Sequence, residues 1–249
     1  AKYNHIGIQG VGMADVADSL TVLKKLVFDE PRVSREEMLE AMRTNFEGKE
    51  VLRQIFLNRV PKYGNDIEEA DGMAAWVAEL YCDCVRGKAT VRGGSFRPGL
   101  FCLSSNTPLG RQVCALPSGR QAGTPLGDGG LSPKHSMDTH GPTAAARSVA
   151  KIPQTLAING VNYNMKFLPS ILKTQEDRQK LTDLIRTYFS LGGMHIQFNV
   201  LTRETLLSAQ KHPEKYRSLV VRVAGYSAFF VELDRDIQNE IISRTEYGS

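Results

Sequence analysis

The chain has 249 residues, of which 41% are hydrophobic and 23% are charged, the composition of a soluble globular protein. Its 31 basic and 27 acidic residues are mixed along the chain, so the net charge of +4 does not indicate a nucleic-acid partner. No apolar stretch approaches the roughly 20 residues that span a bilayer, and the first residues lack a signal-peptide pattern. Composition therefore predicts a cytoplasmic protein with no membrane partner.

The chain contains few cysteines for its length. Without a secretory signal they are expected to be free thiols rather than a disulfide framework. The first two are separated by a single residue and have no histidine nearby, so their spacing predicts no metal site. The four are Cys82, Cys84, Cys102 and Cys114.

The first 90 residues are predicted to be helical. Between Met13 and Val27 the apolar residues recur every three or four positions, which is typical of one buried helix face. Ser34 followed by Glu37 has the spacing of a capping box, and Asp66 with Glu69 repeats that spacing before a second apolar run. Three or four helices are expected before residue 87.

Residues 92–142 are rich in glycine and proline but retain enough large apolar residues to indicate an ordered, winding segment. A short strand is expected near residues 100–104, and Pro142 is placed to begin a helix. His135 and His140 flank Asp138, which could orient a histidine base, but a solvated loop is the favoured interpretation.

Strands alternate with helices from residue 155 onward, which predicts an α/β architecture. Asn159-Gly160 suits a two-residue hairpin turn. Helices are expected at 174–190, 202–210 and 234–245, and a strand at 195–200. In that strand His195, Gln197 and Asn199 alternate with apolar residues, so one face is polar and could line a site or simply meet solvent.

Two apolar, strand-like runs meet at Gly225 within VRVAGYSAFFVEL, residues 221–233. An isolated glycine in a strand is usually a turn or a bulge. A second interpretation is chemical: only glycine leaves a planar, unsubstituted radical when its α-hydrogen is removed, and small neighbours such as Ala224 and Ser227 would let it lie in a dry interior. The residues alone leave both interpretations open.

The wider sequence resembles the C-terminal part of glycyl radical enzymes. RVAGYSA at 222–228, followed by Gln238, Ile241, Ile242, Arg244 and Thr245, is similar to that family's signature. QGVGMADVADSL, PSGRQAGTPLGDGGLSP, GPTAAARSVAKI and GGMHIQFNV extend the likeness across essentially the whole chain. The Ala-Gly-Tyr-Ser form is closer to the dehydratase, choline lyase and arylalkylsuccinate synthase branches than to pyruvate formate-lyase.

The resemblance implies an α/β fold, the C-terminal half of a ten-stranded barrel with a helical N-terminal part and a glycine loop near the C-terminus. It implies a catalytic-barrel portion at 1–120 and a glycyl radical domain at 121–249. In this resemblance Gly225 matches the position of radical storage, and Arg222, Ala224, Tyr226 and Ser227 are expected to support the loop. Phe167 and Leu168 are expected to line the substrate-binding lumen of the barrel.

No bound cofactor or metal is implied, because a separate radical S-adenosylmethionine activase installs the radical. The family's thiyl cysteine lies in a Cys-x-Glu setting, and none of the four cysteines here has Glu two positions later. The resemblance therefore implies an N-terminal chain or half that carries the Cys and Glu, without which this chain would be inactive. The assembled enzyme is expected to form a higher oligomer, such as a dimer, in an anaerobe.

The implied reaction is a radical elimination, as in a dehydratase or lyase, on a small polar substrate such as glycerol or propane-1,2-diol. Radical C–C cleavage, decarboxylation and addition to fumarate remain open, with choline-like compounds, hydroxyproline and arylacetates among the substrates. Two non-catalytic alternatives also remain: a replacement subunit that restores an oxygen-damaged enzyme, and a structural half that only binds a partner. Location in a bacterial microcompartment is open.

Overall fold

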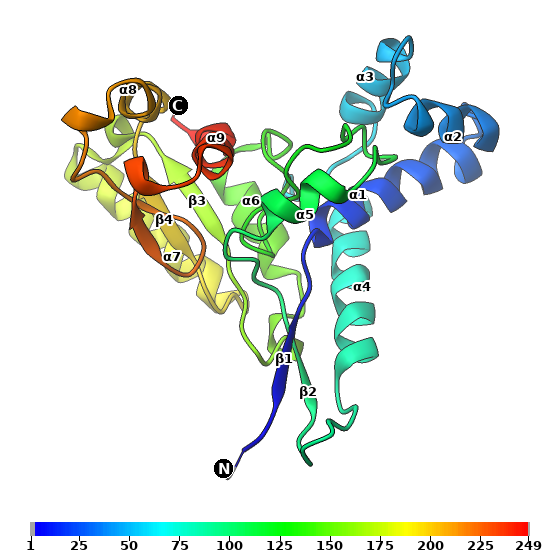
Figure 1. Ribbon diagram of the computed structural model, residues 1–249, viewed down its shortest axis with the longest axis horizontal. Coiled ribbons are helices and arrows are strands. Elements are labelled where there is room, and N and C mark those ends of the chain that lie inside the picture. The colour runs from blue at the N-terminus through cyan, green and yellow to red at the C-terminus, as the bar shows by residue number, and fades with distance from the viewer. Residues whose placement is uncertain (1–2, 249) are drawn as a thin grey trace.

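The computed structural model describes residues 3–248, a mixed α/β structure in which the helices of residues 13–85 lie on one side and the elements of residues 164–247 on the other, with the two strands at 6–9 and 96–99 between them (Figure 1). The helices are α1 (Met13–Leu23), α2 (Arg35–Arg43), α3 (Glu50–Asn58), α4 (Glu68–Val85), α5 (Asn106–Gln112), α6 (Gly141–Ala150), α7 (Gln175–Ser190), α8 (Arg203–Lys211) and α9 (Arg235–Ser243). The strands are β1 (Ile6–Gln9), β2 (Phe96–Gly99), β3 (Asn164–Phe167), β4 (Gln197–Val200), β5 (Val220–Arg222), β6 (Ser227–Phe229) and β7 (Glu246–Tyr247).

The helical N-terminal part is confirmed, with α1 packed along α4 and extended by a π-helical segment at Lys24–Asp29. Ser34 caps α2 as predicted, because its side chain accepts a hydrogen bond from the Glu37 N–H at 3.0 Å. The cap predicted at Asp66 is wrong. Helix α4 starts two residues later, and the Asp66 carboxylate instead pairs with Arg147 (3.0 Å) and Lys151 (3.1 Å) next to α6.

The two sheets that carry the fold are parallel. Strand β3 lies between β4 and β7, with Asn164 opposite Gln197 in the register, and β1 pairs with β2. The hairpin predicted at Asn159-Gly160 is therefore wrong: the chain turns there, with Gly160 at φ +118°, but β3 finds its partners far along the sequence. The strand expected at 100–104 lies earlier, at β2.

The C-terminal elements follow the sequence prediction more closely. Strands β5 and β6 form an antiparallel hairpin on either side of Gly225, and β4, α7, α8 and α9 lie where the pattern placed them. Pro142 occupies the first turn of α6. The glycine-rich stretch before it is ordered and largely buried from Leu126 to Pro133.

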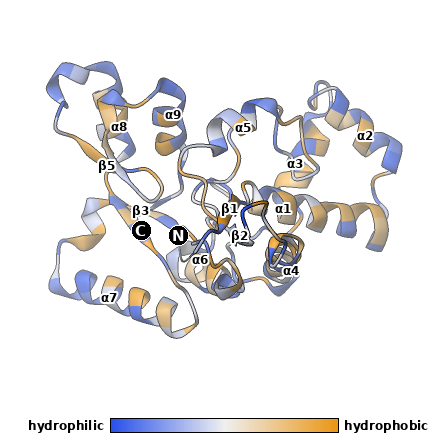
Figure 2. Cartoon of the chain, turned by 60° about the horizontal axis from the view of Figure 1, so that its bottom comes forward, coloured by the Kyte–Doolittle hydropathy of each residue, from blue (hydrophilic) through white to orange (hydrophobic). Residues whose placement is uncertain are grey.

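Three clusters of buried side chains hold these elements together. The first joins α1 and α4 to α6, α7, β3 and β7, so it includes residues from both ends of the chain. The second lies among α1, α2 and α3, and the third joins the β5–β6 hairpin to α8 and α9. Apolar positions recur among polar ones along α7 (Figure 2), as expected for a helix with one buried face. Between residues 3 and 248, no helix has the length and apolar character to span a membrane.

Candidate functional site

Gly225 lies at the tip of the β5–β6 hairpin. Its φ is +80°, a backbone conformation that side-chain-bearing residues rarely adopt, and the hairpin is closed by a 2.9 Å bond from the Val223 N–H to the Tyr226 carbonyl. Val223 and Ala224 are buried, whereas Gly225 itself is exposed. The dry interior expected for this glycine is thus not formed by the described residues alone.

The polar face of β4 holds this hairpin. The Gln197 Oε1 accepts hydrogen bonds from the Gly225 N–H at 3.1 Å and from Arg222 Nε at 2.9 Å. Asn199 pairs with the backbone of Arg222 in both directions, accepting from its N–H at 2.8 Å and donating to its carbonyl at 2.7 Å. Both side chains are buried, so this face of β4 meets the glycine loop rather than solvent.

The other loop residues have distinct positions. Arg222 also donates from Nη1 to the Ser227 hydroxyl at 3.2 Å, which joins the two sides of the hairpin. Tyr226 is half-buried and packs against the third cluster, and Ala224 is buried. The four residues predicted to support the loop flank Gly225 in the hairpin. The backbone of the hairpin is held from β4, where Gln197 binds the Gly225 N–H and Asn199 binds the backbone of Arg222.

A buried group of charged side chains lies beneath the loop. Arg244 contacts both oxygens of Glu240, at 3.0 Å from Nε and 2.9 Å from Nη2, and its Nε lies 3.5 Å from Asp128. His135 Nε2 lies 2.9 Å from Asp128 and 3.2 Å from Glu240. Arg244 also donates to the Arg222 carbonyl at 3.3 Å, so this group is connected to the hairpin.

The proximity of the charged side chains in this buried group shifts their pKa values. Burial would raise the pKa of Asp128 and of Glu240, but the charge of Arg244 and the hydrogen bonds and charge of His135 together outweigh it and hold both pKa values below their usual range. Burial would lower the pKa of His135, but its hydrogen bonds to the two carboxylates raise it instead. With His135 protonated the cluster is electrically neutral.

Asp128, His135 and Glu240 have ligand atoms close enough to hold a metal ion. Arg244 already contacts both carboxylates, and its permanent charge would repel a cation at that point. The arrangement is typical of a structural ion cluster.

The solvated loop predicted around His135, Asp138 and His140 is only partly confirmed: His140 is exposed, but the Asp138 side chain is buried and the His135 side chain is only 9% exposed. Asp138 accepts hydrogen bonds from the hydroxyls of Thr245 and Tyr247, more than 100 residues away. At Gly130 the glycine-rich segment passes so close to the backbone of Leu100 that only glycine fits. A β-carbon there would lie 2.2 Å from the Leu100 carbonyl oxygen.

Leu103 and Asn162 lie beside Gly225. A β-carbon built on Gly225 would lie 3.8 Å from Leu103 Cδ2 and 3.9 Å from Asn162 Nδ2, so among the described residues, its two chain neighbours aside, nothing nearer fills the space over it. Next to Leu103, Cys102 is buried, and burial raises the pKa of its thiol to about 12. Its sulfur donates toward Asn106 Oδ1 at 3.6 Å. As expected, Cys102 is a free thiol, like the other three cysteines.

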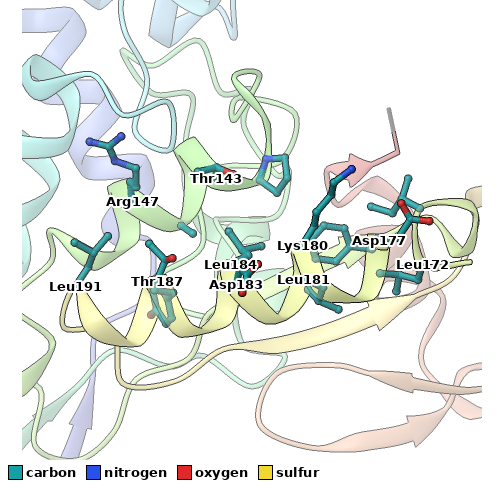
Figure 3. Close-up of a pocket in the computed structure, with 15 residues that line it drawn as sticks. Thr143, Arg147, Leu172, Asp177, Lys180, Leu181, Asp183, Leu184, Thr187 and Leu191 are labelled. Carbon is teal, nitrogen blue, oxygen red and sulfur yellow. The ribbon is translucent and has the colours of Figure 1, made fainter. Parts of the chain in front are cut away.

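The structure does not bring Phe167 or Leu168 to the loop. Phe167 alternates with Lys166 along β3 and packs against Phe198 and Tyr247 on the face opposite Asn164. There it lines a groove of about 610 Å³ between α6 and α7 (Figure 3). This groove includes no residue of the glycine loop. Leu168 is half-buried beside Gly248.

Comparison with known protein families matches residues 1–110 to the family described as Pyruvate formate lyase-like and residues 128–231 to the family described as Glycine radical. The second range includes Gly225 and all four residues predicted to support its loop. The boundary predicted at residue 120 falls between the two ranges.

Known proteins resemble the chain over its full length. A probable dehydratase of Escherichia coli, YbiW, is 43% identical over 99% of this chain and 32% of its own length. The glycerol-bound structure of the B12-independent glycerol dehydratase of Clostridium butyricum matches with a TM-score of 0.96 and 46% identity, covering 100% of this chain and 31% of that one. A structure from Roseburia inulinivorans that concerns 1,2-propanediol dehydration matches with a TM-score of 0.95 and 45% identity. The match covers 99% of this chain and 32% of that one.

These matches confirm the α/β barrel fold that the resemblance implied. The chain spans about a third of the length of these relatives, rather than the half expected from sequence.

Proposed function

Because the chain belongs to the glycyl radical enzymes, we propose that Gly225 stores the radical of an enzyme that eliminates a group from a small polar substrate. The observation that carries this proposal is the loop itself: a glycine at φ +80°, exposed at a hairpin tip, whose N–H is held by a buried strand side chain. No other residue type combines this backbone freedom with an unsubstituted α-carbon.

The radical would be installed by an activase that uses S-adenosylmethionine and an electron from a reductant. The adenosyl fragment takes one hydrogen atom from the Gly225 α-carbon and leaves one unpaired electron there. The nitrogen lone pair on one side and the carbonyl on the other delocalise that electron. Exposure of Gly225 at the hairpin tip supports this step, since the activase has to reach its α-hydrogen.

The stored radical would next take a hydrogen atom from a thiol, leaving a thiyl that abstracts hydrogen from substrate. Cys82 and Cys102 are buried, and neither they nor the exposed Cys84 and Cys114 has the Cys-x-Glu setting. We therefore assign the thiyl cysteine and its acid–base glutamate to a portion outside residues 1–249, on the same chain or on a partner. The activity of residues 1–249 would depend on that portion.

We favour a polyol as substrate, because the relatives described above include a glycerol dehydratase and a structure of 1,2-propanediol dehydration. Elimination from propane-1,2-diol would yield propanal and water. The non-catalytic replacement subunit is less favoured, since the similarity also extends over residues 1–110, which lie far from the glycine loop along the sequence.

Electron paramagnetic resonance (EPR) tests the proposal. Under anaerobic conditions the protein is incubated with a radical S-adenosylmethionine activase, S-adenosylmethionine and reductant. A doublet from the remaining α-hydrogen is expected, and Gly225→Ala should abolish it. Exposure to air should cut the activated chain at Gly225, which mass spectrometry detects. Absence of both signals with an activase that works on a related dehydratase would reject a radical role.

A further inference from the structure

Resting on that proposed function, we infer that Gln197 and Asn164 form a relay that connects the Asp128 carboxylate to the Gly225 N–H and tunes the radical stored there. The chain of bonds runs in one direction. The Gly225 N–H donates to Gln197 Oε1 at 3.1 Å, the Gln197 amide donates from Nε2 to Asn164 Oδ1, and the Asn164 amide donates from Nδ2 to Asp128 Oδ2 at 2.5 Å.

The orientation of the Gln197 amide is fixed by its partners. Two donors, the Gly225 N–H and Arg222 Nε, point at the same end of the side chain. Neither can accept a hydrogen bond, so that end has to be the oxygen, and the nitrogen has to face Asn164. The register of the sheet places Gln197 directly opposite Asn164, which sets the contact between them.

The relay is buried and ends on a charge. Gln197, Asn164 and Asp128 are 7%, 9% and 3% exposed, so water does not compete strongly for their bonds. Asp128 is kept ionised by Arg244 and His135. Each amide that donates toward a carboxylate becomes a better acceptor at its own oxygen, and this polarisation adds along a chain of bonds in a low-dielectric interior.

This hydrogen bond changes the electron density on the nitrogen of Gly225. A stronger acceptor at its N–H makes the nitrogen lone pair more available, and that lone pair is the electron-donating half of the radical's delocalisation. The α-carbon becomes planar when it loses its hydrogen, and because Gln197 fixes the position of this N–H, the two peptide planes have to align by rotation about the bonds of Gly225, which glycine allows. Gln197 is a positioning residue, which acts through the backbone amide of Gly225.

The test compares EPR line shapes in protein labelled with ¹⁵N-glycine. In Gln197→Met, which has a similar length but no strong acceptor, spin should shift from nitrogen to the α-carbon. The ¹⁵N coupling should then fall and the α-hydrogen doublet should widen. Under anaerobic conditions the radical should decay about fivefold faster, the factor that one neutral hydrogen bond provides.

Two further variants separate tuning from simple loosening of the loop. Asn199→Leu removes the neighbouring anchor on Arg222 without touching the Gly225 N–H, so it should lower the yield of radical but keep the wild-type line shape. Gln197→Glu keeps an oxygen acceptor for Gly225 but loses the donor to Asn164. It should restore most of the ¹⁵N coupling lost in Gln197→Met.

The outcomes distinguish this inference from the proposed function. If wild type gives a doublet and Gln197→Met has the same line shape and decay, the relay does not tune the radical, although the radical role stands. If Asn199→Leu changes the ¹⁵N coupling as much as Gln197→Met, the effect is loss of loop order and the inference is overturned. If wild type gives no doublet with a working activase, the proposed function itself fails.

Discussion

At the scale of single residues, the backbone conformation of Gly225 and the space around it constrain substitution differently. A methyl group would fit, since the nearest atom to a built β-carbon is 3.8 Å away. At φ +80°, however, any L-residue is strained. Within this chain it is therefore the conformation of the loop, and not crowding by neighbours, that favours glycine at this position.

Gly225→Ala should consequently fold, with a loss of about 1–2 kcal/mol in the free energy of unfolding, the cost of a left-handed conformation for alanine. Urea unfolding measures this loss. The matched control is Gly123→Ala, because Gly123 has a φ of +77° on the surface with nothing within 4 Å. It should lose similar stability yet keep the radical signal. Loss of that signal in the control would mean that instability, rather than chemistry, removes it.

His135 gives a pH dependence whose sign follows from its raised pKa. Below its ordinary value of 6.5 both folded and unfolded chains carry the proton, so the full stabilisation by Asp128 and Glu240 is present. As pH rises above 6.5 the unfolded chain loses the proton first. The stabilisation is then lost progressively until the folded pKa is passed.

We expect the wild-type free energy of unfolding to fall more steeply between pH 6 and pH 9 than that of His135→Gln, which cannot titrate. Only the difference between the two proteins is informative. Asp18, with a pKa raised by burial to about 7, and Lys62, with a pKa lowered by burial to about 8, also titrate in this range in both. Parallel pH curves would show that the pKa of His135 is the same in the folded and unfolded chains, which would contradict the raised pKa.

The ion cluster beneath the loop could not be predicted from the sequence, because its members are distant along the chain. Asp128 and His135 come from a glycine-rich segment, whereas Glu240 and Arg244 lie on or just after α9. The polar alternation at His195, Gln197 and Asn199 was a usable signal. It predicted a polar face, and the structure shows that two of the three side chains hold the glycine loop.

At the scale of elements, local patterns located most helices and long-range pairing decided most strands. The cap at Ser34 placed the start of α2 correctly, and the helix expected at 174–190 matches α7, since a helix satisfies its own hydrogen bonds. Asn159-Gly160 predicted a hairpin because turn chemistry is local, but β3 pairs in parallel with β4 and β7. Parallel pairing needs long connections that no short pattern records.

Helix α7 carries a complete capping box. The Thr174 hydroxyl accepts from the Asp177 N–H at 3.1 Å, and the Asp177 carboxylate accepts from the Thr174 N–H at 3.0 Å. Thr174→Ala should lower the free energy of unfolding by about 1 kcal/mol. Thr187→Ala, at an exposed position in the same helix, should be neutral or slightly stabilising because alanine favours helix. Equal losses in thermal or urea unfolding would contradict a capping role.

At the scale of the whole molecule, the described residues leave parallel sheets and apolar side chains uncovered. Strand β1 is exposed at Ile6 and Ile8 and pairs on one side only, although parallel sheets in proteins are usually covered on both faces. Trp76 and Leu80, one turn apart on α4, are about half exposed, at 52% and 47%. Such surfaces usually mark an interface.

We therefore expect these surfaces to be covered by the remaining two-thirds of an enzyme of this family. Hydrogen–deuterium exchange tests this by comparing residues 1–249 alone with the same residues co-expressed with an N-terminal barrel portion carrying Cys-x-Glu. The amides of β1 and the peptide around Trp76 should exchange more slowly in the assembly, because edge amides gain partners and apolar surface leaves water.

The α8 peptide, whose Leu206 and Ala209 are already buried in the third cluster, serves as the control and should change little. If β1 exchanges equally fast in both samples, or if residues 1–249 alone are a monodisperse monomer that binds no hydrophobic dye, then these faces are not an interface, and the thiyl cysteine would have to approach Gly225 from another side.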